Sequence, residues 1–395
     1  MNIELGCGRT NGMRTSALKL LHSACALLLL GASGSAAEFN PESAGTTTVP
    51  AAMNRVYVTD PALPHMVDGR IYVLDAADLG LKGMLEAGFA GTMLAAPDKH
   101  RIYVATTFYE RLTRGKRTDV VQVFDDETLK VVDEIPIPPR RAQALSYRNL
   151  FQRSSDGNVL FIQNATPATS VSIVDTASKH QFEVPTPGCY GIYPAPTEPL
   201  RFSTLCGDGT IGTYTVSSNL RSSERKTSAK LFDANADPLF IHAERDQDGY
   251  VFLSFKGKLL RALLNGESAM IAETLNVVPA DATDWAPGGY QPFAVDPKSG
   301  MAYILMHSGN KDGAHKNPSA EIWAYDIRGK RLVARSPASN LTSLTLSAVD
   351  PTVLFGINPI DATIERFTID ASSRRISRAG EIKLGETAAL VEAPR

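Results

Sequence analysis

Cysteine and tryptophan are scarce in this 395-residue chain, which has four of the first and two of the second, and neither sign of charge dominates. The formal net charge is −2, so no overall basic field favours nucleic acid or an anionic membrane as a partner. Hydrophobic residues make up 43% and charged residues 21%, a composition typical of a globular protein rather than a disordered one. The length allows two or three ordinary domains or one large repetitive domain.

Long apolar runs are also missing, apart from Leu20–Leu30 near the N-terminus. Arg9, Arg14 and Lys19 precede this run and the small residues Ser35–Ala37 follow it, which is the order found in a secretory signal peptide. The run is shorter than the roughly 20 residues that cross a bilayer, so a membrane anchor is disfavoured.

We therefore expect residues 1–37 to be a signal peptide that directs the chain to the periplasm. Residues 38–52 should form an N-terminal arm, and residues 53–395 should form the folded domain. Removal of the signal peptide leaves Cys189 and Cys206, which lie 17 positions apart in a chain bound for an oxidising compartment. We expect a disulfide, because a redox pair or a metal site would need a C-x-x-C spacing or neighbouring histidines.

Helical periodicity is not evident, and short β-branched and aromatic runs recur instead, about every 50 residues. Their aromatic positions are Tyr57, Tyr103, Phe161, Phe202, Phe252, Tyr303 and Phe355. Seven repeats of this length, each with several short strands, predict an all-β fold and a seven-bladed β-propeller. A pair of β-sandwiches or a solenoid is the alternative, but the count, the period and the total length favour a closed ring.

Motifs that carry chemistry are few. No G-x-S-x-G elbow, P-loop or dinucleotide fingerprint is present, and we predict no catalytic residue, no bound cofactor and no metal in this chain. The aspartates that end many strand-like runs, such as Asp125 and Asp175, are expected to hold turns. The histidines are scattered, and we expect each of them to have a structural role or to lie on the surface: His65, His100, His180, His242, His307 and His315.

Residues 106–119 differ from the matching part of the other repeats. They place Phe108 and Tyr109 beside a run of four cations, and we interpret them as a long loop that serves recognition. The alternative is a solvated hairpin in which Arg117 and Asp119 pair with each other.

The stretch Arg111–Asp125 closely resembles the heavy chains of quinoprotein amine dehydrogenases, the methylamine and aromatic amine dehydrogenases. The resemblance covers roughly residues 53–370, and the order and spacing of the segments fit the aromatic amine (aralkylamine) branch better. The further segments that carry it are Gln163–Ser170, Gly188–Tyr190, Cys206–Gly209, Trp285–Tyr290, His315–Lys316 and Ala320–Trp323.

This resemblance implies the heavy subunit of a periplasmic oxidoreductase that converts primary amines to aldehyde and ammonia. The family's cofactor, tryptophan tryptophylquinone, belongs to a small light chain in an α2β2 heterotetramer, and electrons pass to a small blue copper protein of the azurin or amicyanin type. An alignment through Arg111 puts the aromatic of the family's substrate channel at Tyr109, so Phe108 and Tyr109 are the predicted channel residues. Trp285 and Trp323 are expected in different repeats, as core or interface aromatics rather than a cofactor pair.

Two other functions remain open at this point. One is a stand-alone periplasmic propeller that binds a ligand or a protein, which the sequence Val56–Asp60 superficially suggests. The other is a propeller enzyme with its own site, such as a lactonase. A pyrroloquinoline quinone dehydrogenase is disfavoured, because its tryptophan-rich motifs need more than two tryptophans.

Overall fold

The computed structural model describes residues 48–51, 53–144, 147–338 and 340–394, which belong to one compact unit. The predicted signal peptide and most of the predicted N-terminal arm lie outside the described residues. Val49, at the end of that arm, is buried and its backbone N–H donates to the carbonyl of Glu127 (2.8 Å). No helix within the described ranges is long and apolar enough to cross a membrane.

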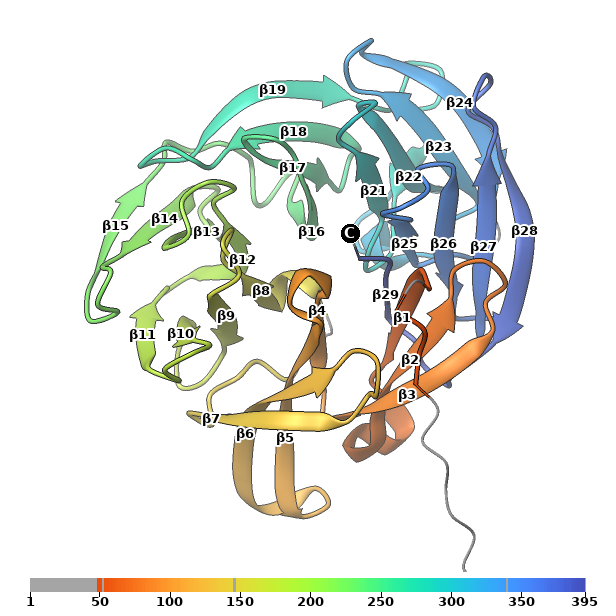
Figure 1. The fold of residues 1–395 in the computed structure, drawn as a ribbon. Coiled ribbons are helices and arrows are strands. Elements are labelled where there is room, and N and C mark those ends of the chain that lie inside the picture. The colour runs from red at the N-terminus through yellow and green to blue at the C-terminus, as the bar shows by residue number, and fades with distance from the viewer. Residues whose placement is uncertain (1–47, 52, 145–146, 339, 395) are drawn as a thin grey trace, which may run out of the picture. The chain divides into compact units, whose positions relative to one another are not determined.

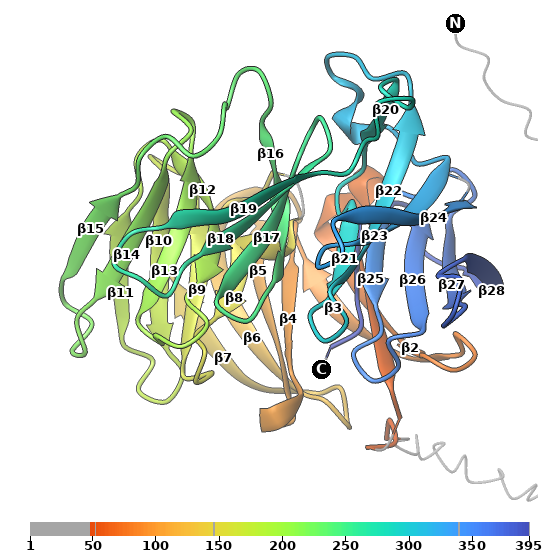
Figure 2. The ribbon, with the colours of Figure 1, turned by 90° about the horizontal axis from the view of Figure 1, so that it is seen from above.

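Strands within these ranges form seven antiparallel sheets that follow one another around a common axis (Figure 1). Figure 2 shows the sheets from the side, with most of their strands upright. We name the sheets A to G in chain order. The strands of sheets A to C, in order of pairing, are β29 (Leu390–Glu392), β1 (Arg55–Asp60), β2 (Gly69–Asp75) and β3 (Leu81–Gly88); β4 (Thr92–Ala96), β5 (Arg101–Arg111), β6 (Arg114–Asp125) and β7 (Val131–Ile137); and β8 (Phe151–Arg153), β9 (Val159–Asn164), β10 (Ser170–Asp175) and β11 (Gln181–Pro185).

Sheets D to G repeat this pattern, with one extra strand in sheet F. They contain β12 (Cys189–Pro194), β13 (Arg201–Cys206), β14 (Ile211–Val216) and β15 (Ser223–Thr227); β16 (Leu239–Arg245), β17 (Gly249–Ser254), β18 (Lys258–Leu263) and β19 (Met270–Asn276); β20 (Trp285–Pro287), β21 (Phe293–Asp296), β22 (Met301–Ser308), β23 (Glu321–Asp326) and β24 (Arg331–Pro337); and β25 (Ser343–Leu346), β26 (Val353–Asn358), β27 (Thr363–Ile369) and β28 (Ile376–Lys383). Short 3-10 helices lie in the connections: η1 (Leu63–Asp68), η2 (Pro97–Lys99), η3 (Arg148–Leu150) and η4 (Ala314–Lys316).

Each repeat of about 50 residues in the sequence corresponds to one sheet, and the recurring aromatic residue marks the same strand in every sheet. All seven recurring aromatic residues lie on the strand that follows the innermost one, and each is at most 5% exposed. Because side chains alternate across a strand, these buried rings can fill the space between one sheet and the next. The expectation of seven repeats built from short strands is confirmed at the level of the sheets.

The core is divided into seven clusters of buried side chains, and each cluster contains residues of two successive sheets. One of them joins the last sheet to the first, since Phe355 of β26 and Val58 of β1 belong to the same cluster. Strand β29 also pairs with β1, with Val391 opposite Val58, so the C-terminal strand completes the sheet that the N-terminal strand begins. The fold is therefore all-β and β-propeller-like.

The aspartates that end strands hold turns, as expected. The carboxylate of Asp175 accepts hydrogen bonds from the backbone N–H of Ser178 (2.7 Å) and from the Ser178 hydroxyl (2.8 Å). Asp125 accepts the same pair of bonds from Thr128. These donors lower the pKa of both carboxyl groups, because they stabilise the charged form.

Two predictions about pairs of residues have different outcomes. The Cys189–Cys206 disulfide is confirmed, and its cysteines lie opposite each other on β12 and β13. The assignment of Trp285 and Trp323 to different repeats is wrong: both lie in sheet F, with ring centroids 5.5 Å apart. The reason is the extra strand β20, which comes before β21 in the chain. Both β20 and β21 pair with β22, so Trp285 of β20 lies in the sheet that contains Trp323. Trp323 is fully buried, in agreement with a core role.

Glu392 on the C-terminal strand β29 makes the stability of the fold depend on pH. Burial raises its pKa to about 7 from an ordinary value of 4.5, while nearby Arg148 lowers it and Glu244 raises it. The folded state therefore holds a proton that the unfolded chain has lost, and stability falls as the pH rises from about 4.5 to about 7. Glu392→Gln should remove this slope and stabilise the protein at pH 8 by up to about 3 kcal/mol.

Urea denaturation at pH 5 and pH 8 measures this effect, with the exposed Glu386→Gln as the matched control. Equal slopes of stability against pH in the wild type and in Glu392→Gln would contradict the assignment.

Candidate functional site

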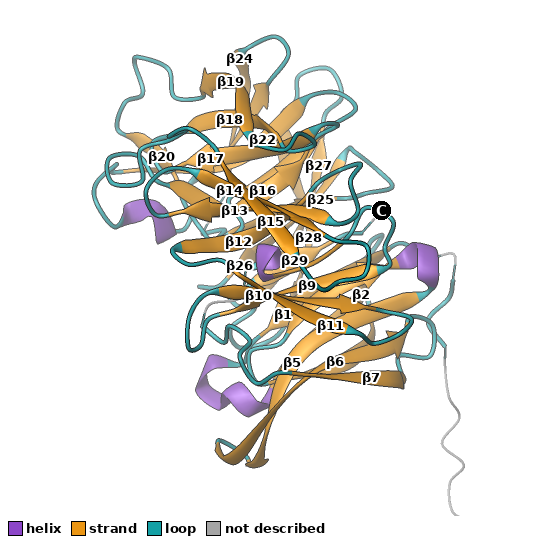
Figure 3. Ribbon diagram, turned by 90° about the vertical axis from the view of Figure 1, so that its left-hand side faces the viewer, coloured by secondary structure: helices purple, strands orange, loops and turns teal. Residues whose placement is uncertain are grey.

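The segments that carry the family resemblance meet at one end of the sheets. This end, which we call the hairpin face, is where the second strand of each sheet turns into the third and where the first strand begins. The register places Cys189 opposite Cys206 here, Asn164 opposite Ser170, and Trp285 opposite Ser308. Figure 3 shows β20 and the tip of the β5–β6 hairpin toward the same side of the sheets.

The predicted recognition loop at residues 106–119 is instead a β-hairpin, which corrects the interpretation as a loop. Strands β5 and β6 stay paired up to Arg111 opposite Arg114, across a two-residue turn. The outer strands leave earlier, because β4 pairs with β5 only as far as Ala105 and β7 pairs with β6 only as far as Asp119. Beyond these points the hairpin is a two-stranded ribbon that extends past its sheet (Figure 1).

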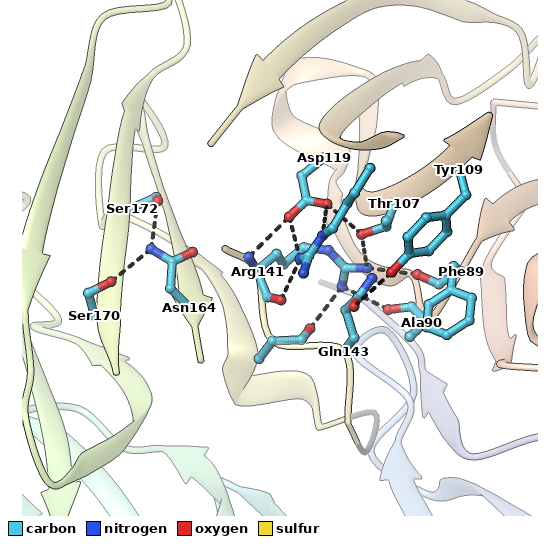
Figure 4. Close-up of polar contacts among 12 residues, drawn as sticks. Phe89, Ala90, Thr107, Tyr109, Asp119, Arg141, Gln143, Asn164, Ser170 and Ser172 are labelled. Carbon is cyan, nitrogen blue, oxygen red and sulfur yellow. Dashed lines mark hydrogen bonds and ion pairs between the residues drawn. The ribbon is translucent and has the colours of Figure 1, made fainter. Parts of the chain in front are cut away.

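A buried carboxylate fixes the base of this ribbon. Asp119 has no exposed side-chain surface, and it accepts hydrogen bonds from the Thr107 hydroxyl (2.8 Å), from Nε and Nη2 of Arg117 (2.8 and 2.6 Å) and from the backbone N–H of Arg141 (3.0 Å) (Figure 4). The expected alternative, pairing of Arg117 with Asp119, is therefore confirmed. A buried charge with this number of donors is compensated rather than costly.

Arg141 ties two connections of the chain and strand β5 together at that base. Its guanidinium donates to the carbonyls of Phe89 (2.7 Å) and Ala90 (2.8 Å), between β3 and β4, and to the Thr107 hydroxyl (3.1 Å) on β5. Arg141 itself belongs to the connection from β7 to β8. Burial lowers its pKa to about 10, against a raising effect of Asp119, so the side chain stays charged at neutral pH.

The two predicted channel residues are half-buried, not fully exposed. The ring of Tyr109 meets the ring of Phe89 edge to face, with centroids 5.6 Å apart, and its hydroxyl donates to Oε1 of Gln143 (3.3 Å) (Figure 4). Phe108 is next in the strand and therefore faces the other side of the ribbon. The structure thus gives Tyr109 defined neighbours and separates it from Phe108.

Side-chain amides form hydrogen bonds that hold the neighbouring β9–β10 hairpin of sheet C. Asn164 is fully buried, and its Nδ2 donates to the hydroxyls of Ser170 (3.0 Å) and Ser172 (2.9 Å) (Figure 4). Gln163 links this hairpin to sheet D, because its Oε1 accepts a hydrogen bond from the backbone N–H of Gly191 (3.1 Å). These bonds hold successive parts of the hairpin face in one arrangement.

Two of the histidines, His242 and His315, take structural positions, whereas His65, His100 and His180 are exposed. His242 is buried, with Nε2 2.9 Å from the carbonyl oxygen of Phe293 and 3.1 Å from Glu244, and His315 stacks on the ring of Phe255 at 4.1 Å. Within the part of the chain that the structure describes, no group of three or more His, Cys, Asp or Glu side chains is placed to hold a metal ion.

Sequence reasoning missed Phe89, Arg141 and Gln143. Each lies in a connection between strands, where no period marks it, and Arg141 follows a run of prolines that indicates only a turn. The nearest available signal was the Arg117–Asp119 pair, because a buried carboxylate needs further donors.

The family of methylamine dehydrogenase heavy chains matches residues 52–391, which is most of the chain. The chain belongs to this family. A methylamine dehydrogenase heavy chain from Methylophilus methylotrophus is 28% identical over 323 residues, which cover 80% of this chain and 78% of that one. The heavy chain from Paracoccus versutus is 29% identical, and the match covers 77% of this chain and 71% of that one.

Solved structures agree on the fold of this family member. The periplasmic gluconolactonase of Pseudomonas aeruginosa superposes with a TM-score of 0.60, covering 86% of this chain and 99% of that one. A functionally unknown protein from Desulfotomaculum acetoxidans gives a TM-score of 0.59, covering 86% of this chain and 98% of that one. Sequence identities of 14% and 12% limit both likenesses to the fold.

Asp119 should dominate the stability of the hairpin base. Asp119→Ala leaves Arg117 and the Arg141 N–H without their acceptor, and we expect a loss of about 3 kcal/mol in the free energy of unfolding. The control is Asp68→Ala, because Asp68 pairs with Arg70 at the surface, where the two side chains are 58% and 42% exposed. That control should change stability by no more than about 0.5 kcal/mol. Denaturant titration compares the two, and equal effects would show that the buried network is not stabilising.

Proposed function

We propose that this chain is the heavy subunit of a periplasmic amine dehydrogenase whose catalytic quinone, tryptophan tryptophylquinone, belongs to a separate light subunit. The reaction would convert a primary amine to an aldehyde and ammonia. The observation that carries the proposal is the family match over residues 52–391, supported by the gathering of the family-like segments on the hairpin face.

The architecture supports a scaffold role for this chain. Seven sheets, seven intervening clusters and the β1–β29 pairing support a seven-bladed propeller, with one sheet per blade. Such a ring presents its turns as a fixed surface, and the hairpin face is the surface we assign to the light subunit. An α2β2 assembly and a small blue copper protein as the electron acceptor complete the proposal.

The partner's quinone would supply the redox chemistry, and the residues of this chain would shape the approach to it. Asp119 and Arg141 hold the ribbon at a fixed angle to the β3–β4 connection, so Tyr109 and Phe89 keep their edge-to-face contact. Tyr109 would then form an aromatic wall of the substrate channel and favour aryl amines by shape. Phe108 lies on the opposite face of the ribbon from Tyr109 and would contact the edge of the channel.

Reconstitution tests the division of labour between subunits. The heavy chain alone should be folded, β-rich and colourless, and it should not oxidise phenylethylamine or methylamine with a dye acceptor. Addition of the quinone-bearing light subunit should produce amine-dependent dye reduction. Amine oxidation by the isolated heavy chain, or a heavy chain that never binds the light subunit, would overturn the proposal and leave a stand-alone propeller as the alternative.

Tyr109→Ala in the complex tests the selectivity of the channel. An aromatic contact contributes roughly 0.5–1.5 kcal/mol beyond area burial, so kcat/KM for aryl amines should fall roughly 2- to 12-fold while methylamine changes less. Tyr109→Phe is the matched control, because it keeps the ring and removes only the bond to Gln143. An unchanged ratio of the specificity constants for phenylethylamine and methylamine in Tyr109→Ala would mean that Tyr109 packs its own hairpin and selects nothing.

A further inference from the structure

We infer that the tip of the β5–β6 hairpin, residues 110–116, is an electrostatic docking arm that inserts into an acidic patch on the partner subunit. This inference rests on the proposed function and adds the surface and the chemistry of the contact. The tip of the ribbon lies beyond the Tyr109 contacts and the buried base described above.

The tip has no support from its own sheet. Pairing with β4 ends at Ala105 and pairing with β7 ends at Asp119, so only β5 and β6 continue outward. A two-stranded hairpin is marginally stable by itself in water, yet here its base is fixed by the Asp119 network. The chain thus holds a polar ribbon out from its body in a defined direction.

The charge on the tip is one-sided. Arg111, Arg114 and Lys116 are exposed, and within the described residues none of these three side chains has an ion-pair partner. Glu110 is the one carboxylate of residues 110–116, and it accepts a hydrogen bond from the backbone N–H of Lys116 (3.2 Å). The fourth cation of the run, Arg117, is already neutralised by Asp119. Three free cations at the end of an arm fit an opposing surface of carboxylates.

The turn of the hairpin also presents an apolar side chain. Leu112 is 75% exposed, with a left-handed backbone (φ 56°). Leu79 and Leu220 have the same left-handed backbone, but they are only 2% and 6% exposed. The leucine at the tip therefore does not pack against its own chain. An apolar residue ringed by cations is typical of a contact that buries a small centre inside a polar rim.

A protein surface is the occupant that these features favour. Membrane-binding basic segments gather about 4–8 cations, whereas this tip has three and the whole chain carries a net charge of −2. A tip-to-tip contact between two copies of this chain is also disfavoured, because each tip would then face the cations of the other. The light subunit is the partner that the proposed function supplies on this face.

The test compares two triple variants with matched charge changes. In the first, Arg111, Arg114 and Lys116 are each replaced by Glu. The control replaces Lys130, Arg221 and Lys298 by Glu, because these cations are also exposed but lie in turns at the opposite end of the sheets. A third variant, with Gln at positions 111, 114 and 116, removes charge without reversing it and keeps the test valid if the Glu variant folds poorly.

Binding of each heavy-chain variant to the purified light subunit is measured at several salt concentrations. We expect wild-type binding to weaken as salt rises, and we expect the tip variant with Glu to bind roughly 10- to 100-fold more weakly at low salt and to lose this salt dependence. The affinity of the Gln variant for the light subunit should lie between those of the wild type and the Glu variant, and the control should bind like the wild type.

Equal binding by the wild type and both tip variants would overturn the inference while leaving the proposed function intact. Failure of the wild type to bind any light subunit would instead remove the proposed function. Loss of binding to anionic phosphatidylserine vesicles, or of self-association, in the tip variants with unchanged light-subunit binding would assign the arm to another occupant and contradict the inference.

Discussion

Burial between neighbouring sheets is the interaction on which the rest of this protein depends. Each sheet is narrow, and its apolar side chains find cover only against the sheet before it and the sheet after it. The seven clusters that result include one between the last sheet and the first. The pairing of Val391 with Val58 joins the two ends of the described chain in one sheet, so that neither end sheet is left with an open face.

A frame of this kind leaves the turns free to vary, because the strands already satisfy one another. Most turns of the hairpin face are short, and the disulfide closes one of them. The β5–β6 hairpin departs from this pattern by extending past its sheet. Two buried side chains support its base: Asp119 accepts hydrogen bonds from the Thr107 hydroxyl and the backbone N–H of Arg141, and the Arg141 guanidinium donates to the carbonyl of Phe89.

The chemistry of the site follows from this arrangement. The strand-ending aspartates of this heavy chain hold turns, and the base of its β5–β6 hairpin has a fixed geometry. Its half-buried aromatics lie at the base of the ribbon and its free cations lie at the tip. We propose that selection of the amine and attachment of the partner belong to different parts of this one hairpin, with the Asp119 network holding its base.

The sequence by itself determined the features that depend on local pattern. The 50-residue period marked the second strand of every sheet, the strand-ending aspartates marked turns, the two remaining cysteines marked the disulfide, and Arg111–Asp125 indicated the family. Only the tertiary structure decided that residues 106–119 form a hairpin rather than a loop and that Trp285 and Trp323 share a sheet. The contact of Arg141 with Phe89 joins residues 52 positions apart. Periodicity reports which face of a strand is buried, but the packing of one sheet on the next decides which distant connections meet, and no local pattern contains that information.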